Sequence, residues 1–249
     1  MPHRHKVVGV LGGMGPEATL AFYANLIAAT PATRDQDHLQ VIINSNPRVP
    51  DRTAAVLGKG PSPVPALLAG IEVLARAGAT FVVIPCVSAH IFIDELRKDA
   101  ALPVISILDV VADAIGGHPG GVRKVGLIAT EGTIRAGVFA RRLSAGQIDV
   151  LCPAETDQGI VSGAIYDVKA GATPARRRAI AGDLVAVSER LIASSAQALV
   201  LGCTEIPLVF PSASVGVPVF DSLKLLAEAS VAAAGLPPVV VDPPRLGEK

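Results

Sequence analysis

The sequence is poor in aromatic residues and has no tryptophan, although half of its 249 residues are hydrophobic. Its core must therefore be built from alanine, valine, leucine and isoleucine, a composition typical of α/β proteins. Lysine plus arginine equals aspartate plus glutamate, at 22 each, so no basic excess favours nucleic acid or an anionic membrane as a partner. We expect small-molecule ligands instead.

Cysteine is also scarce, because the chain has only three, at the widely separated positions 86, 152 and 203. An odd number without close pairs gives no disulfide framework and no CxxC metal site. We interpret them as reduced thiols and expect a cytoplasmic protein. The most apolar later stretch, 206–220, is broken by three prolines and is too short to span a membrane. The opening MPHRHKVVGVLGGMG lacks an A-x-A cleavage region, so it predicts a first strand rather than a signal peptide.

Short apolar runs alternate with longer helical patterns along the chain. The runs are continuously apolar, which is typical of parallel strands covered by helices on both faces. The expected strands are 7–11, 40–44, 81–85, 103–107, 124–129, 148–151, 198–202 and 217–220. The expected helices are 16–30, 63–77, 91–99, 173–195 and 222–234. This alternation predicts right-handed crossovers and ligand sites at the carboxyl ends of the strands.

A repeat divides the chain into two similar halves. Gly9 and Gly126, each inside an expected strand, are 117 positions apart, and so are Cys86 and Cys203. The offset fails in the middle of each half, where the loops must differ in length. We interpret the repeat as a duplication. The predicted fold class is α/β with two similar domains, each a four-stranded, mainly parallel sheet flanked by helices, related by pseudo-twofold symmetry.

Each half ends a strand in a cysteine, within VVIPCVSAH (82–90) and LVLGCTE (199–205). If the halves face each other, Cys86 and Cys203 approach one cleft from opposite sides. Unsatisfied N–H groups at a helix start lower the pKa of a thiol, so we expect a thiolate and a thiol of nearly matched strength. Such a pair removes a proton from one face of a substrate carbon and returns one to the other face, which inverts the carbon.

Hydrogen-bond donors and cations near the expected cleft suit an anionic substrate. Ser88 and Thr204 are expected to donate to the enolate-like carboxylate that develops during proton removal. Arg52, after the second expected strand, suits the two parallel hydrogen bonds that a carboxylate accepts, and Lys169 adds a point charge. Each cation has a plainer interpretation, Arg52 as a surface arginine capped by Asp51 and Lys169 as a solvated lysine at a helix end.

The same stretches leave other hypotheses open. His90 and Cys86 would suit a thiol hydrolase with a Cys-His pair, but the favoured interpretation of His90 is a residue that packs or caps locally. The stretch LGGMGPEA (11–18) fits the dinucleotide fingerprint, but the end of the second expected strand carries Asn44 and Asn46 rather than an acidic residue. We therefore interpret it as a glycine loop that lets the backbone approach the cleft. The third cysteine is interpreted as a small hydrophobic residue.

Six motifs occur in the order and spacing of one known family: GGMGPEAT (12–19), DQDH (35–38), PDRT (50–53), PCVSAH (85–90), GLIAT (126–130) and LGCTE (201–205). Over nearly its whole length the chain resembles the cofactor-independent aspartate/glutamate racemases, specifically the aspartate racemase branch. The resemblance implies a homodimer that uses neither pyridoxal phosphate nor a metal. It also implies two domains with the active site between them, formed by residues 1–105 plus 220–249 and by residues 106–219.

The resemblance also implies roles for individual residues. Cys86 and Cys203 match the paired acid/base cysteines. The predicted substrate-binding residues are Met14, Arg52, Val87, Ser88, Thr130, Lys169, Thr204 and Glu205. Among these, Arg52 and Lys169 match positions that hold the side-chain carboxylate of the substrate, and Thr130 and Thr204 lie near its α-carboxylate.

Two features bear on the substrate. The branch usually reads PCNTAH, and here Val87 removes an amide whose hydrogen bond is worth roughly 1–3 kcal/mol, whereas Ser88 keeps a hydroxyl. Glu205 stands where glutamate racemases have histidine, which favours aspartate. The sequence thus predicts a racemase of acidic amino acids, aspartate before glutamate. The alternatives are a non-catalytic small-molecule binding protein and a decarboxylase or isomerase of related fold, but related decarboxylases keep only one of the two cysteines.

Overall fold

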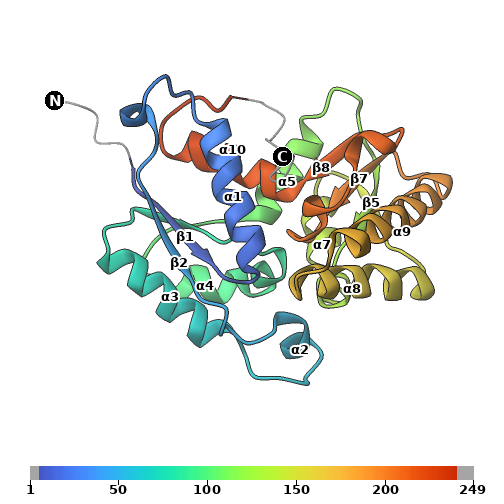
Figure 1. Ribbon diagram of the computed structural model, residues 1–249, viewed down its shortest axis with the longest axis horizontal. Coiled ribbons are helices and arrows are strands. Elements are labelled where there is room, and N and C mark those ends of the chain that lie inside the picture. The colour runs from blue at the N-terminus through green and yellow to red at the C-terminus, as the bar shows by residue number, and fades with distance from the viewer. Residues whose placement is uncertain (1–5, 240–249) are drawn as a thin grey trace.

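The computed structural model describes residues 6–239 and contains two four-stranded sheets (Figure 1). The first sheet has the strand order β2-β1-β3-β4 and the second β6-β5-β7-β8, and all neighbouring strands are parallel. The strands are β1 (Val8–Gly12), β2 (Val41–Ser45), β3 (Phe81–Val83), β4 (Val104–Ile105), β5 (Lys124–Ile128), β6 (Asp149–Leu151), β7 (Ala198–Leu201) and β8 (Val219–Asp221). The equivalent strand orders confirm the predicted fold class.

Helices cover both faces of each sheet. The α-helices are α1 (Pro16–Ala29), α2 (Arg52–Val56), α3 (Val64–Arg76), α4 (Ile93–Asp99), α5 (Ile107–Gly116), α6 (Glu131–Ala136), α7 (Val138–Ser144), α8 (Glu155–Lys169), α9 (Pro174–Ala193) and α10 (Ser222–Ala233). The 3₁₀ helices are η1 (Asp35–Asp37), η2 (Val87–Phe92), η3 (Ile206–Leu208) and η4 (Ser212–Ser214). The last helix, α10, packs against α1 and α5. None of the helices within residues 6–239 has the length and apolarity needed to cross a membrane.

The hydrophobic core has three parts, and the central part is shared by both halves. It joins one face of each sheet to α1, α5 and α10, with the fully buried Phe22 and Phe139 contributed by opposite halves. The second part lies between the second sheet and the helices α8 and α9, and the third lies between the first sheet and α3. Because Val200 faces the central core while its neighbour Leu201 faces α8 and α9, β7 is buried on both faces. This explains the continuous apolarity of the strand sequences.

The repeat in the sequence has a packing cause. A Cβ on Gly9 would lie 2.9 Å from the Cβ of Ala79 and 3.4 Å from Leu74 of α3. A Cβ on Gly126 would lie 3.1 Å from the Cβ of Leu191 of α9. Leu74 and Leu191 are themselves 117 positions apart. In both halves, therefore, a glycine lets the corresponding helix pack closely against the central strand.

All eight expected strands are present, with one important change of length. The expected strand 103–107 is reduced to Val104–Ile105, because Ser106 accepts a hydrogen bond from the Asp109 amide at 3.2 Å and starts α5. The five expected helices are confirmed as α1, α3, α4, α9 and α10, whereas α2, α5, α6, α7 and α8 had not been predicted. The domain boundaries stay a prediction, and residues 1–5 and 240–249 of the expected first domain lie outside the described residues.

Candidate active site

Cys86 and Cys203 follow equivalent strands, since one comes after β3 and the other after β7. Both side chains are buried, with 3% and 5% of their surface exposed. Gly202 precedes the second cysteine because a Cβ there would lie 2.5 Å from a methyl carbon of Leu127 on β5. The chain thus turns tightly at the carboxyl end of the sheet, directly before the cysteine.

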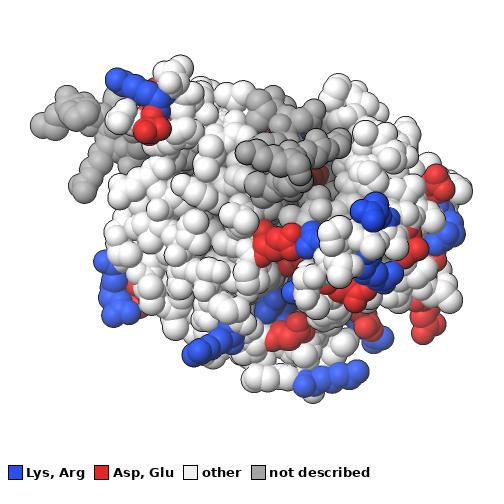
Figure 2. Space-filling model, viewed as in Figure 1, with Lys and Arg blue, Asp and Glu red and all other residues white. Residues whose placement is uncertain are grey.

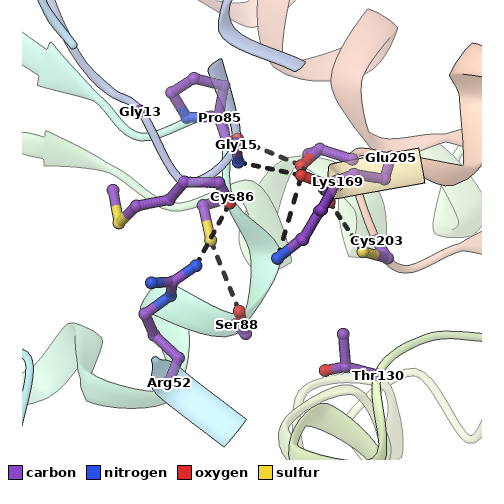
Figure 3. A network of polar contacts seen from close by, with 12 residues as sticks. Gly13, Gly15, Arg52, Pro85, Cys86, Ser88, Thr130, Lys169, Cys203 and Glu205 are labelled. Carbon is purple, nitrogen blue, oxygen red and sulfur yellow. Dashed lines mark hydrogen bonds and ion pairs between the residues drawn. The ribbon is translucent and has the colours of Figure 1, made fainter. Parts of the chain in front are cut away.

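The two cysteine-bearing turns are in direct contact. Thr204 Oγ1 donates a hydrogen bond to the carbonyl oxygen of Pro85 at 3.2 Å. The charge of Lys169 interacts with both Cys86 and Cys203, and Figure 3 draws the ammonium group between the two sulfurs. The two thiols and a cation therefore share one region between the halves.

His90 does not contact the sulfur of Cys86. Its Nδ1 lies 2.9 Å from the carbonyl oxygen of Cys86, and its Nε2 lies 3.4 Å from that of Ile105. The ring is fully buried, and burial lowers its pKa. His90 thus holds the turn between β3 and η2 through backbone contacts, which supports the interpretation of local packing. The Sγ of Cys86 lies instead 3.4 Å from Ser88 Oγ.

Cys203 lies beside a carboxylate. Its thiol donates to Glu205 Oε2 at 3.0 Å, while Glu205 Oε1 accepts a hydrogen bond from the Gly15 amide at 2.9 Å. Burial, together with the negative charge of Glu205, raises the pKa of Cys203 well above its usual value. The expectation that this thiol has a lowered pKa is therefore wrong, because a buried carboxylate rather than a helix start faces the sulfur.

Arg52 and Lys169 supply the positive charge of the site. The guanidinium Nη1 donates to the carbonyl oxygens of Val49 and Pro50 at 3.2 and 3.0 Å, and Nη2 donates to that of Met14 at 3.3 Å. The Nε of Arg52 is buried and has no hydrogen-bond partner within residues 6–239. Arg52 is thus a buried residue at the start of α2 rather than a surface arginine.

Both cations stay charged in this environment. Burial opposes the charge on Arg52, but the charges of Cys86 and Asp51 outweigh it and raise its pKa. Burial likewise opposes the charge on Lys169, but Glu205 and Cys203 raise its pKa. The ammonium group of Lys169 lies 4.0 Å from Glu205 Oε1. Figure 3 shows both cations directed toward the region of the cysteines.

The remaining predicted residues differ in their surroundings. The backbone carbonyl of Met14 holds Arg52, and the Met14 side chain is buried. Val87 packs in the central core. Thr130 caps α6, where its hydroxyl accepts from the Thr133 amide at 3.2 Å, and in Figure 3 it lies apart from the hydrogen-bonded network.

A cavity of about 230 Å³ adjoins the site between α2 and the helices α6 and α8. Its lining includes Asp51, Thr130 and Tyr166, but neither cysteine. Packing between α2 and α6 is tight, since a Cβ on Gly132 would lie 2.8 Å from the Cα of Thr53. The cavity is therefore bounded by the close contact of α2 with α6.

The glycine loop before α1 packs closely against other segments of the protein. Gly13 has a φ of 91°, and a Cβ there would lie 2.4 Å from the backbone of Asn46. The Gly15 amide at the start of α1 donates to Glu205, as described above. These contacts fit the interpretation of a loop that approaches the cleft. Residues 6–239 contain no cluster of three or more histidine, cysteine, aspartate or glutamate side chains able to hold a metal ion.

Comparison with known proteins identifies the family of the chain. The profile of the Asp/Glu/hydantoin racemase family matches residues 11–230, and the chain therefore belongs to this family. The structure of Picrophilus torridus aspartate racemase is 31% identical, with a TM-score of 0.82 and coverage of 92% of this chain and 94% of that one. An aspartate racemase homologue from Pyrococcus horikoshii is 24% identical, with a TM-score of 0.71 and coverage of 92% and 99%. The broad specificity amino-acid racemase RacX of Bacillus subtilis is 23% identical over 231 residues, which cover 90% of this chain and 96% of RacX.

One relationship was missed by sequence reasoning. Glu205 had been predicted to bind substrate, but its carboxylate contacts the thiol of Cys203 and the amide of Gly15. The spacing Cys-x-Glu was visible in the sequence and is the signal that places a carboxylate near the sulfur. The contact with Gly15 had no such signal, because it joins residues 190 positions apart.

Proposed function

We propose that the protein racemises an acidic amino acid, with aspartate preferred over glutamate, by acid/base catalysis with two cysteines. The observation that carries this proposal is the equivalent position of Cys86 and Cys203 after β3 and β7, in two turns that the Thr204–Pro85 hydrogen bond joins. Membership of the racemase family supports it.

The proposed chemistry is one proton removal and one proton return. One sulfur, as thiolate, takes the α-proton while the C–H bond breaks and its electrons move toward the α-carboxylate. The other sulfur, as thiol, gives its proton to the opposite face of the same carbon. A positioned proton donor or acceptor contributes about 10²–10⁴-fold to the rate, so electrostatic stabilisation of the enolate-like intermediate must supply the rest. We assign that task to Ser88, whose hydroxyl lies 3.4 Å from Cys86 Sγ, because the Thr204 hydroxyl already donates to the Pro85 carbonyl.

The substrate class follows from the cations. Three backbone carbonyls fix the guanidinium of Arg52, and its Nε, which has no hydrogen-bond partner among residues 6–239, remains free to donate one hydrogen bond. A buried N–H without a partner costs about 1–3 kcal/mol, which a bound carboxylate would recover. We therefore assign Arg52 to the side-chain carboxylate of an acidic substrate. The name of the relative from Picrophilus torridus supports aspartate.

We further propose that the reaction needs neither pyridoxal phosphate nor a metal, because the two thiols supply both proton transfers, and that the enzyme works in the cytoplasm as a homodimer. An apolar stripe on α1 supports the dimer, since Leu20, Tyr23 and Ile27 are 58%, 37% and 43% exposed. Figure 2 shows few charges over α1 on this face, whereas charges gather over α8 and α9. Light scattering during gel filtration tests the dimer.

Two alternatives differ in what they require. A non-catalytic binding protein needs the cations but no thiol chemistry. A Cys-His hydrolase needs His90 to face the sulfur of Cys86, whereas its ring nitrogens face backbone carbonyls.

The test is incubation with L- and D-aspartate or glutamate in D₂O, following α-deuterium uptake by NMR and inversion by optical rotation. A racemase exchanges the α-proton and inverts the carbon. Cys86→Ala and Cys203→Ala should each abolish inversion, whereas the exposed Cys152→Ala should not. Absence of exchange with every amino acid tried favours the binding protein, and activity that survives Cys203→Ala favours the hydrolase.

A further inference from the structure

Glu205 is a buried carboxylate for which the two-thiol scheme has no use. Only 2% of its surface is exposed. One oxygen accepts from Cys203 at 3.0 Å and the other from the Gly15 amide at 2.9 Å. Its ion pair within residues 6–239, with Lys169, is long at 4.0 Å. A carboxylate held this firmly against a thiol is placed to exchange a proton with it.

We propose that Cys203 and Glu205 share one proton, and that Glu205 is the positioning residue that makes Cys203 a base. The inference rests on the proposed racemase function. When the α-hydrogen of the substrate faces Cys203, the thiol proton moves to Glu205 Oε2, and the sulfur then takes the α-proton as the C–H bond breaks. The thiol of Cys86 gives its proton to the opposite face.

Protons and charge balance in this step. Before it, the pair of Cys203 and Glu205 holds one proton and a charge of minus one, and Cys86 is a neutral thiol. After it, Cys203 is a thiol, Glu205 is a neutral carboxylic acid and Cys86 is a thiolate. One negative charge has moved from the pair to Cys86, and the substrate has exchanged one proton for another.

The surroundings explain why a shared proton is needed. A thiolate at Cys203 beside an ionised Glu205 would bring two negative charges to 3.0 Å in a buried site. Burial and that carboxylate indeed raise the pKa of the Cys203 thiol. Passing the thiol proton to Glu205 avoids the double charge.

The two sulfurs have different charged neighbours. Arg52 of α2 interacts with Cys86, whereas Lys169 of α8 interacts with both sulfurs and Cys203 also has Glu205 beside it. The two sulfurs therefore become bases in different ways, Cys86 beside cations and Cys203 by passing a proton to a carboxylate. It follows that removing the carboxylate must impair the Cys203 step selectively.

Overall rates cannot reveal this selectivity, because the equilibrium constant of a racemisation is one and kcat/KM is then equal in both directions. One-sided exchange separates the steps. Cys86→Ala leaves only Cys203 to exchange the α-proton of one aspartate enantiomer in D₂O, and Cys203→Ala leaves only Cys86 to exchange that of the other. Glu205→Gln is then added to each variant. Glutamine still offers an oxygen to the Gly15 amide, but its amide group does not take up a proton.

We expect Glu205→Gln to lower the exchange catalysed by Cys203 by about 10²-fold and the exchange catalysed by Cys86 by less than about threefold. Equal losses in both backgrounds would overturn the shared proton while leaving the racemase intact. If the unaltered enzyme exchanges neither enantiomer of any amino acid tried, it is the proposed function that fails.

A second measurement does not depend on turnover. The rate at which iodoacetamide alkylates Cys203, followed against pH in a Cys86→Ala/Cys152→Ala background, reports its titration. Glu205→Gln removes a negative charge and should move the midpoint to lower pH. Glu17→Gln is the matched control, because Glu17 also joins the halves, through Arg177 at 2.7 Å, without touching the sulfur. An unmoved midpoint in Glu205→Gln, or an equal movement in the control, contradicts the proposal.

Discussion

Thr204 and Pro85 join the two turns that carry the cysteines. The Thr204 hydroxyl donates to the Pro85 carbonyl at 3.2 Å, and each residue is the immediate chain neighbour of one cysteine. Thr204 is 1% exposed, so the bond is shielded from water. The two cysteine-bearing turns are thus tied together by a buried hydrogen bond whose donor also lies 3.4 Å from Glu205 Oε2.

Thr204→Val should lower kcat strongly and the free energy of unfolding only modestly. Valine keeps the shape but loses the donor, which leaves the Pro85 carbonyl without this partner at a cost of about 1–3 kcal/mol. Because the bond ties the two cysteine-bearing turns together, we expect a loss in kcat of about tenfold or more. Ser230→Ala removes a buried hydroxyl that bonds within α10, and it serves as the control for stability. A Thr204→Val enzyme with unaltered kcat would argue against this role.

Arg52→Lys should raise KM for an acidic substrate. Lysine has no Nε donor and cannot make the parallel hydrogen bonds of a guanidinium, so the side-chain carboxylate loses a charge-assisted bond worth roughly 1.5–3 kcal/mol. We expect KM for aspartate to rise about tenfold or more. The exposed Arg48, four residues earlier, gives the control Arg48→Lys, for which KM should not change. Steady-state kinetics with both enantiomers decides between these outcomes.

Gly126→Ala should destabilise the fold. The new Cβ would lie 2.9 Å from a methyl carbon of Leu199 and 3.1 Å from the Cβ of Leu191, so α9 must move away from β5. Overpacking of this kind costs about 1–3 kcal/mol of unfolding free energy. Gly163→Ala on α8, where a Cβ would meet nothing within 4 Å, should instead stabilise by up to about 1 kcal/mol. Urea unfolding curves of the two variants should shift in opposite directions.

The strands and the cysteine pair could be predicted because their signals are local or repeated. Burial on both faces leaves a continuous apolar run for each strand, and the duplication repeats the context of Cys86 at Cys203. The helix α5, with the sequence ILDVVADAIG, was not predicted, and only its first residue, Ile107, lies in the expected strand 103–107; the cap at Ser106 marks where the strand ends and the helix starts. The helix α8 was missed because its sequence, ETDQGIVSGAIYDVK, contains two glycines.

The contacts of the site were less predictable, because they join distant parts of the chain. The burial of Arg52 depends on the carbonyl of Met14, 38 positions away, and on the turn before α2. The contact of Glu205 with Gly15 requires the two halves to meet. Val87 was assigned to substrate by its neighbourhood in the motif, yet its side chain packs in the central core. Motif position indicates which turn a residue occupies, not the direction of its side chain.

Asp109 gives a prediction about pH and stability. It lies on α5 and pairs with Arg97 of α4 at 2.9 Å and with Arg142 of α7 at 2.6 Å, so it joins helices from both halves. Burial opposes its charge, but the two arginines outweigh burial and lower its pKa below the ordinary value of 3.8. A carboxyl group with a lowered pKa in the folded state stabilises the fold above its unfolded pKa, and this contribution is lost as pH falls through the folded pKa.

Asp109→Asn should therefore destabilise the protein near neutral pH and cease to do so in acid. Because the carboxylate is 34% exposed, the loss should be about 1 kcal/mol or less. Unfolding free energies of Asp109→Asn and the unaltered protein should differ at about pH 7 and converge below the ordinary pKa of aspartate. Asp149→Asn removes an exposed carboxylate and is the control. The difference between its unfolding free energy and that of the unaltered protein should not change with pH in this way. A difference for Asp109→Asn that stays constant down to strongly acidic pH would mean that its charge does not join the helices, and that the two arginines are held by other contacts.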